Sequence, residues 1–260
     1  MLNGYITRTF VALRTIAFKE THRYLRIWAQ TLLPPVITMT LYFVIFGNLI
    51  GSRIGPMEGY GYMEFIAPGL IMMSVITNAY ANVVSSFFGA KFQGHIEEIL
   101  VSPTPNYTIL LGYLAGGVGR GLLTGLLVTG VATFFADLNI HSPLITLSVV
   151  FLTALLFSIG GFINGVFARK FDDVAIVPTF VLTPLTYLGG VFYTISLLPA
   201  LWQNVSLANP ILYMVNAFRY GILGASDIPI GTAYLIVGAF IIAGGSVSMM
   251  LLNRGVGLRH

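Results

Sequence analysis

Long apolar runs separated by short polar segments dominate the chain, and their positions predict its fold. Each run is continuously apolar, so it lacks the two-residue alternation that marks the strands of a membrane β-barrel. A helix needs about 20 apolar residues to cross a hydrocarbon core of about 30 Å. Six runs are long enough, which predicts membrane-spanning helices at about residues 31–51, 65–89, 108–135, 143–168, 174–190 and 230–252.

Pairs of prolines mark two of these predicted helices. Pro34 and Pro35 lie near the start of the first span and suit a first helical turn, where the missing N–H group would be unpaired in any case. Pro178 and Pro184 fall inside the fifth span, and we expect a kink there.

An amphipathic helix is predicted ahead of the first span, over residues 5–28. Apolar and aromatic side chains recur on one face, at Phe10, Leu13, Ala17, Tyr24 and Trp28. Polar and basic side chains line the opposite face, at Arg8, Thr15, Lys19, His22 and Arg26. Such a helix is expected to lie in the cytoplasmic membrane interface, with its basic face toward the headgroups. Both a simple anchor and a docking surface for a partner fit this pattern.

The second span carries a stripe of polar side chains. Its members lie three or four residues apart, at Ser74, Asn78, Asn82, Ser85 and Ser86. Lipid cannot satisfy their hydrogen bonds, so the stripe must face protein or water. Helix packing and the lining of a transport path are both open interpretations.

The third span is rich in glycine and contains a charge. Small residues at four-residue steps let helix backbones approach closely, and such steps occur at Gly112, Gly116, Gly117, Gly121 and Gly125. This helix is therefore expected at the centre of the bundle or of a dimer. Arg120 is the only charge deep in any predicted span. An intramembrane arginine suggests function, and both a structural lock and a contact with substrate are open.

Residues 90–105 form a polar segment between the second and third spans, in which we expect a short cytoplasmic helix closed by Pro103. Two adjacent carboxylates, Glu97 and Glu98, stand beside Ile96 and Leu100. Paired carboxylates can perform acid–base chemistry, but only His95 is near them in the sequence. A solvated or partner-facing surface is the favoured interpretation.

Residues 191–222 stay apolar, but the breaks at Pro199 and at Asn209–Pro210 leave no stretch long enough to span. Aromatic side chains are frequent here, at Tyr193, Trp202, Tyr213 and Tyr220. The pattern predicts helices that dip into the outer leaflet and return. Irregular backbone at that depth must be buried in protein or line a cavity.

Composition and charge support a membrane protein. Hydrophobic residues make up 56% of the chain and charged residues 8%, against roughly 25% charged in soluble domains. Basic residues gather before the first span, around the loops on the same side and after the sixth span, at Arg8, Arg14, Lys19, Arg23, Arg26, Lys91, Arg169, Lys170, Arg254 and Arg259. This asymmetry predicts that both termini are cytoplasmic, and it leaves no basic face for nucleic acid.

Candidate catalytic chemistry is missing from the sequence. There are no cysteines, and none of the three lysines follows a glycine as a P-loop requires. The four histidines form no metal-ligand pair at helical spacing, so we expect no catalytic or metal site. All nine acidic residues lie outside the span centres, which disfavours a proton-coupled carrier. Energy for transport would then come from another polypeptide at the cytoplasmic surfaces.

Several motifs, in their order, resemble a known family. The first span opens with LLPPVITMTLYFVIFG, and the cytoplasmic segment between the second and third spans contains GHIEEILVSP. The last third of the chain contains PTFVLTPLTYLGGVFY and NPILYMVNAFRYGILG. This order is similar to the ABC-2 type permeases, the membrane subunits of ATP-driven exporters, and among them to the YadH-type bacterial inner-membrane permeases. The resemblance covers essentially the whole chain.

The resemblance implies an all-α polytopic membrane protein with the type V exporter fold, as a single ABC-2 type transmembrane domain over residues 1–260. Such a half-transporter pairs as a homodimer in the bacterial inner membrane, surrounded by lipid. It binds two copies of a separate ATPase. That partner would hold ATP and Mg²⁺, so no cofactor is expected in this chain.

The resemblance also assigns roles to residues. The interface helix at 5–28 and a coupling helix within 90–105 would contact the ATPase, through Arg14, Lys19, Glu97 and Glu98. The second and fifth helices would surround the path, placing Ser74, Asn78, Asn82 and Tyr187 toward it, with Arg120 as a further candidate. Residues 191–222 would form the external re-entrant gate, with Tyr193, Trp202, Tyr213 and Arg219. Arg219 would brace the gate rather than bind substrate.

Three functions follow as hypotheses. The first is the permease subunit of an ATP-driven exporter, which fits a membrane path without a motor. The second is an ion-coupled secondary carrier that works alone. The third is a membrane scaffold without any path.

Overall fold

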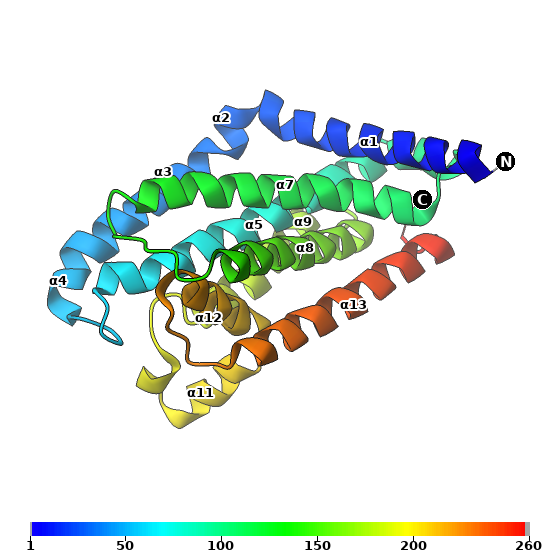
Figure 1. The fold of residues 1–260 in the computed structure, drawn as a ribbon. Helices are drawn as coiled ribbons and strands as arrows, with labels where there is room; N and C mark the ends of the chain where they lie inside the picture. Colours follow the sequence, from blue (N-terminus) through cyan, green and yellow to red (C-terminus); the bar gives the residue numbers. More distant parts are fainter. Residues whose placement is uncertain (1, 258–260) are drawn as a thin grey trace.

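The computed structural model describes residues 2–257, and nearly all of them are helical (Figure 1). Arg259 of the predicted basic tail lies outside the described residues. The long helices run side by side as a bundle with two ends (Figure 1). The start of the first helix and the end of the last lie at one end, which we call the terminal end. The other is the loop end.

The chain begins with a helix that is followed by a broken span. In order these elements are α1 (Leu2–Arg26), α2 (Trp28–Thr31), α3 (Leu33–Tyr42), the π-helical η1 (Phe43–Ile50) and α4 (Gly51–Ile54). The prolines Pro34 and Pro35 lie in the first turn of α3, as predicted. The segment at 5–28, for which an amphipathic helix is predicted, is covered by α1 and the first residue of α2, with a break between Arg26 and Trp28.

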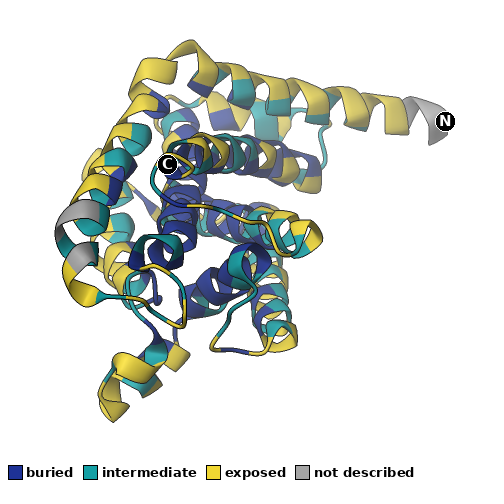
Figure 2. Ribbon diagram, turned by 60° about the vertical axis from the view of Figure 1, so that its left-hand side comes forward, coloured by how far each residue is buried: buried dark blue, intermediate teal, exposed yellow. Residues whose placement is uncertain are grey.

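Four long helices form the rest of the bundle: α5 (Tyr62–Phe92), α7 (Asn106–Ala132), α8 (Pro143–Phe167) and α13 (Ile230–Arg254). Together with Trp28–Gly47 they are the five segments within residues 2–257 that are long and apolar enough to cross a membrane. These five correspond to five of the six predicted spans. α5 is the most deeply buried of them, and Figure 2 shows the buried residues concentrated where the helices face one another.

The predicted fifth span at 174–190 is not among those five segments. The chain there forms α9 (Phe171–Val177), the π-helical η2 (Pro178–Leu182) and α10 (Thr183–Tyr187), which have 7, 5 and 5 residues. Proline lacks the N–H group that a regular α-helix uses, and the π-helical turn begins at Pro178. The three pieces together rise about 25 Å, which is short of a hydrocarbon core of about 30 Å.

Short helices occupy the remaining segments. They are α6 (His95–Val101), the 3-10 helix η3 (Ile195–Leu197), α11 (Ala200–Leu207) and α12 (Pro210–Leu223). The breaks predicted at Pro199 and at Asn209–Pro210 are the starts of α11 and α12. The side chain of Asn209 caps α12 by accepting a hydrogen bond of 3.0 Å from the Ile211 N–H group. α6 lies at the terminal end and α11 at the loop end (Figure 1).

Glycines let α7 pack closely against α1, α5 and α8, as its sequence predicts. A Cβ atom added at Gly112 would lie 2.5 Å from Ile16 of α1. One added at Gly121 would lie 2.9 Å from the Cβ of Ala79 on α5. The glycines therefore form two faces, one for α1 and one for α5 and α8.

The closest approach between α5 and α8 generates a prediction about stability. A Cβ atom at Gly161 would lie 2.5 Å from the carbonyl oxygen of Tyr80, and neither backbone can yield easily. We expect Gly161→Val to reduce the free energy of unfolding by about 1–3 kcal/mol. Thermal unfolding in detergent measures this. Gly130→Val is the control, because no atom lies within 4 Å of a Cβ added there, and equal melting temperatures for the two variants would contradict the prediction.

Candidate functional site: arginines that join helices

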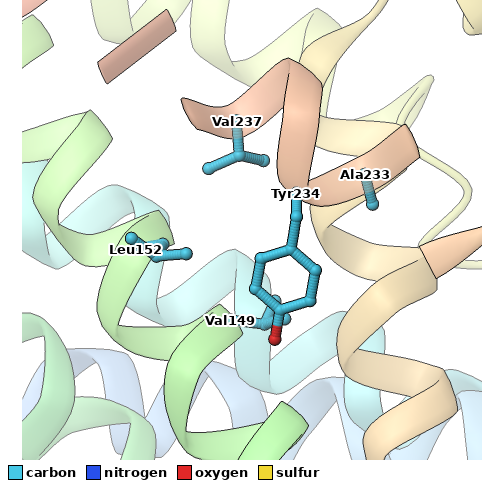
Figure 3. Close-up of a pocket in the computed structure, with 5 residues that line it drawn as sticks. All are labelled: Val149, Leu152, Ala233, Tyr234 and Val237. Carbon is cyan, nitrogen blue, oxygen red and sulfur yellow. The ribbon is translucent and has the colours of Figure 1, made fainter. Parts of the chain in front are cut away.

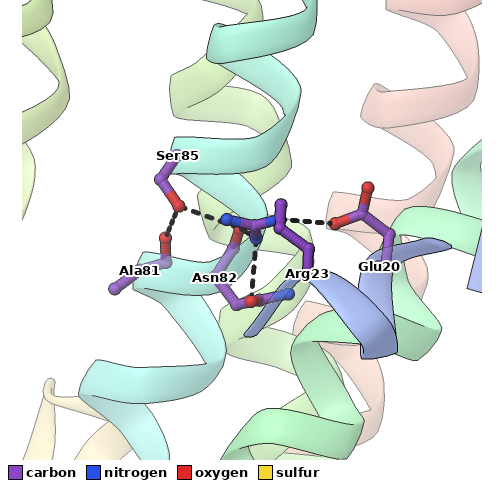
Figure 4. A network of polar contacts seen from close by, with 5 residues as sticks. All are labelled: Glu20, Arg23, Ala81, Asn82 and Ser85. Atoms are coloured by element: carbon purple, nitrogen blue, oxygen red, sulfur yellow. Dashed lines mark hydrogen bonds and ion pairs between the residues drawn. The ribbon is translucent and has the colours of Figure 1, made fainter. Parts of the chain in front are cut away.

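A polar network joins α1 to α5 near the terminal half of the bundle (Figure 4). The Nη2 atom of Arg23 donates to both the carbonyl oxygen and the side-chain oxygen of Asn82, each at 2.9 Å. The same carbonyl oxygen accepts from the Ser85 hydroxyl at 3.2 Å. Arg23 thus attaches α1 to the predicted polar stripe of the second span.

Glu20 completes this network from the side of α1. Its carboxylate oxygen lies 3.4 Å from Nε of Arg23, and the residue is only 1% exposed. A buried carboxylate needs a compensating charge, which Arg23 supplies from one helical turn further along. The sequence analysis treated Arg23 as orientation charge and gave Glu20 no role. The spacing of opposite charges at i and i+3 is the signal that could have found the pair.

Arg120 makes a second polar link between helices, one helical turn along α5 from the first. We call the links made by Arg23 and Arg120 the clamps. Its Nη2 atom donates to the side-chain oxygen of Asn78 and to the carbonyl oxygen of Thr31, each at 3.0 Å. The Thr31 hydroxyl donates in turn to the carbonyl oxygen of Tyr24 at 2.8 Å. Arg120 therefore joins α7 to α5 and to the junction between α1 and α3. This geometry is that of a structural lock.

The predicted path stripe is largely buried inside the chain. Ser74 and Asn82 have no exposed surface, and Asn78 is 6% exposed. The exposed face of α5 instead carries Thr77 and Ser85. The described chain thus turns the two asparagines toward arginines of other helices. Whether they take part in a path remains a prediction.

Tyr187, the other path candidate, lies apart from that stripe. It is 41% exposed, and its hydroxyl lies 3.1 Å from the hydroxyl of Tyr42 on α3. Phe192 stacks on Tyr187 with ring centroids 5.8 Å apart and contacts Phe46 at 4.8 Å. These rings link α10 to α3 and η1, so Tyr187 belongs to an aromatic cluster.

Arg219 of the predicted gate is almost fully buried. Its Nη2 atom donates to the carbonyl oxygen of Gly190 at 2.6 Å, and its Nε atom donates to that of Phe65 at 3.3 Å. The guanidinium also stacks on the Phe65 ring at 4.0 Å. Arg219 therefore ties α12 to the start of α5 and to the turn after α10.

The aromatic gate candidates occupy different environments. Trp202 of α11 is 47% exposed, whereas Tyr193 is half-buried. The Tyr213 hydroxyl donates to the carbonyl oxygen of Leu207 at 2.7 Å and so closes the corner between α11 and α12. The structure does not bring these three side chains to one point.

The candidates for ATPase coupling are all exposed. Glu97 and Glu98 stand on α6, which Ile96 anchors with a fully buried side chain. Arg14 and Lys19 are exposed on α1, but five residues of helix separate them by about 140°. They therefore point to different sides of α1.

The face of α1 that packs on α7 divides the predicted aromatic face. Tyr24 is buried and lies near Gly119 of α7, and Leu13 and Ala17 are half-buried, whereas Phe10 and Trp28 are 64% and 58% exposed. The helix thus has a packed face with the buried Glu20 at its centre, an exposed aromatic face and an exposed basic face.

One cavity lies between α8 and α13, lined by Val149, Leu152, Ala233, Tyr234 and Val237 (Figure 3). Its volume of about 10 Å³ holds little more than one water. A hydrogen bond between the hydroxyls of Tyr234 and Ser148 lies beside it. This cavity is too small for a substrate. Over residues 2–257 no three His, Asp or Glu side chains gather as metal ligands.

The chain is similar in sequence to known membrane transport proteins. The family model of the ABC-2 type transporters matches residues 11–223. The inner membrane transport permease YadH of Escherichia coli K12 is 60% identical over 250 residues, which cover 96% of this chain and 98% of YadH. Nodulation protein J of Rhizobium leguminosarum bv. viciae is 27% identical over 219 residues, which cover 82% of this chain and 83% of that protein.

The buried ion pair generates a prediction about stability. We expect Arg23→Gln to cost about 3 kcal/mol of unfolding free energy, because it leaves the Glu20 carboxylate buried without its counter-charge. The double variant with Glu20→Gln and Arg23→Gln should recover much of this loss. Unfolding of the single and double variants in detergent measures the coupling. Additive losses would show that the two charges do not depend on each other.

Proposed function

This chain belongs to the ABC-2 type transporter family, and from that premise we propose that it forms the membrane half of an ATP-driven exporter. It is a multi-pass inner-membrane transport permease. The proposal adds the energy source, the direction and the assembly: two copies of the chain would form the path, and two copies of a separate ATPase would bind ATP and Mg²⁺.

In this proposal the chain crosses the membrane six times, with the type V exporter fold. The segment from α9 to α10 would be the fifth crossing, short and bent at Pro178. The helices α11 and α12 would be the re-entrant gate at the external loop end, braced by Arg219. Both termini and α6 would then be cytoplasmic, in agreement with the predicted distribution of basic residues.

The observation that supports ATPase coupling best is the position of α6. This helix of 7 residues connects α5 to α7, the two helices that the clamps join. Ile96 fixes it to the bundle, while Glu97 and Glu98 remain exposed at the terminal end. A partner that displaces α6 would therefore displace both helices. Lys19 and Arg14 on α1 offer a basic surface to the same partner, each on its own face.

The exposed stripe of α5 supports a path between two copies. Thr77 and Ser85 lie on it eight residues apart, with Ala81 between them. Small and hydroxyl side chains suit either close helix contact or a polar wall. The path would be lined by this stripe, with Ser74, Asn78, Asn82 and Arg120 behind it and Tyr187 on the fifth crossing.

A proton-coupled carrier is the second candidate, and the buried Glu20 favours it. Ionisable side chains within a membrane bundle often serve as proton relays. Its contact with Arg23 at 3.4 Å instead favours a structural ion pair within α1. A scaffold without a path would need no exposed hydroxyl stripe on α5.

Charge reversal on α6 tests the coupling. We expect the variant with Glu97→Lys and Glu98→Lys to retain the ATPase no longer, or to lower substrate-stimulated ATP hydrolysis at least tenfold, because the contact becomes repulsive. Co-purification and hydrolysis in lipid vesicles measure this. Asp137→Lys is the matched control, since Asp137 is an exposed carboxylate outside α6. Intact coupling in the double reversal would contradict the proposal.

Reconstitution separates the exporter from the carrier. We expect vesicles that contain only this chain to show no transport on a proton gradient. In vesicles that also contain the ATPase, we expect ATP-driven transport by the Glu20→Gln variant to depend on external pH as it does for the unchanged chain. Transport on the gradient alone, abolished by Glu20→Gln, would establish the carrier instead.

A further inference from the structure

Besides the small cavity between α8 and α13, two larger cavities form one groove along α8, away from the clamps and from α6. Residues of α5, α9, η2, α12 and α13 complete the lining of the second one. The first has a volume of about 550 Å³ and lies where α5, α8 and α13 end. Lys91, Arg169 and Val256 are among its lining residues. Three candidate spans end there, at Phe92, Phe167 and Arg254, which is the depth of a lipid headgroup.

Lys91 gives this cavity a fixed positive charge. The side chain is only 5% exposed, and its Nζ atom donates to the carbonyl oxygens of Val166 and Ala168, each at 2.6 Å. These carbonyls are left free by the end of α8. An ammonium group has three N–H donors, so one donor remains for a ligand. Arg169, at the exposed rim of the same cavity, adds a second cation.

Asp172 and Asp173 follow Arg169 in the first turn of α9, and neither lines the cavity. Asp173 accepts hydrogen bonds from the backbone N–H groups of Arg169 and Lys170, at 2.8 and 3.0 Å. These bonds hold the pKa of Asp173 below its usual value. Its charge is directed at the start of α9, and it does not line the cavity.

The second cavity continues the groove toward the middle of the bundle. Its volume is about 370 Å³, and it is lined mainly by apolar side chains such as Phe157, Phe167, Leu182 and Phe240. Phe167 and Phe240 are 58% and 47% exposed, so the cavity opens on the outer surface of the bundle, where lipid lies. Apolar cavities of this size commonly bind small molecules.

Phe167 lines both cavities, which makes them neighbours along one helix. From Leu156 to Phe167 the α8 helix rises about 17 Å. That length matches one leaflet, about half of a hydrocarbon core of about 30 Å. The groove therefore has cationic groups at headgroup depth and an apolar channel as deep as one leaflet.

We propose that this groove binds a lipid whose headgroup carries an anionic phosphate. The phosphate would be held by the free Lys91 donor and by Arg169, and one acyl chain would lie along Phe157, Phe167 and Phe240. The site is separate from the proposed ATPase contacts and does not depend on export.

Native mass spectrometry of the full chain in detergent, titrated with phosphatidylglycerol, tests the headgroup. We expect Arg169→Gln to lower the affinity roughly tenfold, the usual loss for one charge-assisted hydrogen bond. Lys170→Gln is the matched control, because Lys170 is the adjacent exposed cation but does not line the cavity. Equal losses in the two variants would overturn the proposal, since they would reflect general surface charge.

Gly160→Leu tests the acyl chain without changing any charge. A Cβ atom at Gly160 would lie 3.6 Å from the Tyr80 ring, an ordinary contact, so a larger side chain fits and fills the cavity. We expect it to lower phosphatidylglycerol binding at least fivefold, whereas Gly130→Leu on the exposed face of α7 should not. Competition by inorganic phosphate together with an unchanged affinity in Gly160→Leu would identify a site for free phosphate and overturn the lipid.

Discussion

Pairing of buried polar groups is the constraint on which this bundle depends. A polar group left without a partner in hydrocarbon costs several kcal/mol. Arg23, Arg120 and Arg219 each meet this requirement with carbonyl oxygens of other elements, on Asn82, Asn78 and Gly190 respectively. Because each arginine has at least one acceptor outside its own helix, pairing its charge also fixes how two elements meet. The same acceptor groups therefore stabilise each arginine charge inside the bundle and fix the arrangement of the helices.

This pairing requires helices that approach closely, and glycine provides the approach. A Cβ atom added at Gly116 of α7 would lie 2.5 Å from the Cβ of Glu20 and 3.2 Å from the side-chain nitrogen of Asn82. The point where α1, α5 and α7 come closest is thus the point where the ion pair and its amide lie. A larger residue at 116 would separate the arginine from its acceptors as well as the backbones from one another.

Sequence alone predicted the parts of this structure that depend on local pattern. Hydropathy located five spans, prolines located the starts of α3, α11 and α12, and Arg120 was noticed because it stands alone in an apolar run. Local pattern does not identify Glu20 and Lys91, because only the packing of α1 on α7 and of α5 beside α8 buries them. Arg23 is half-buried, and in the sequence it is one of several basic residues ahead of the first span. The segment at 174–190 was expected to span because its composition is apolar, but its prolines shorten it.

The clamps also determine which parts of the chain can move. Arg23 and Arg120 join α1, α5 and α7 into one unit, and the close contact at Gly161 adds α8 to it. A displacement applied at α6 must therefore move this unit as a whole. The segment from α9 to α10 is different, since none of the residues of α9 is buried and a π-helical turn interrupts its hydrogen-bond pattern. The contact of Tyr187 with Tyr42 joins it to the bundle, as do hydrogen bonds that Asn164 and Asn209 donate to its carbonyl oxygens. If parts of this chain move against one another, the division lies between the clamped unit and this separately attached segment.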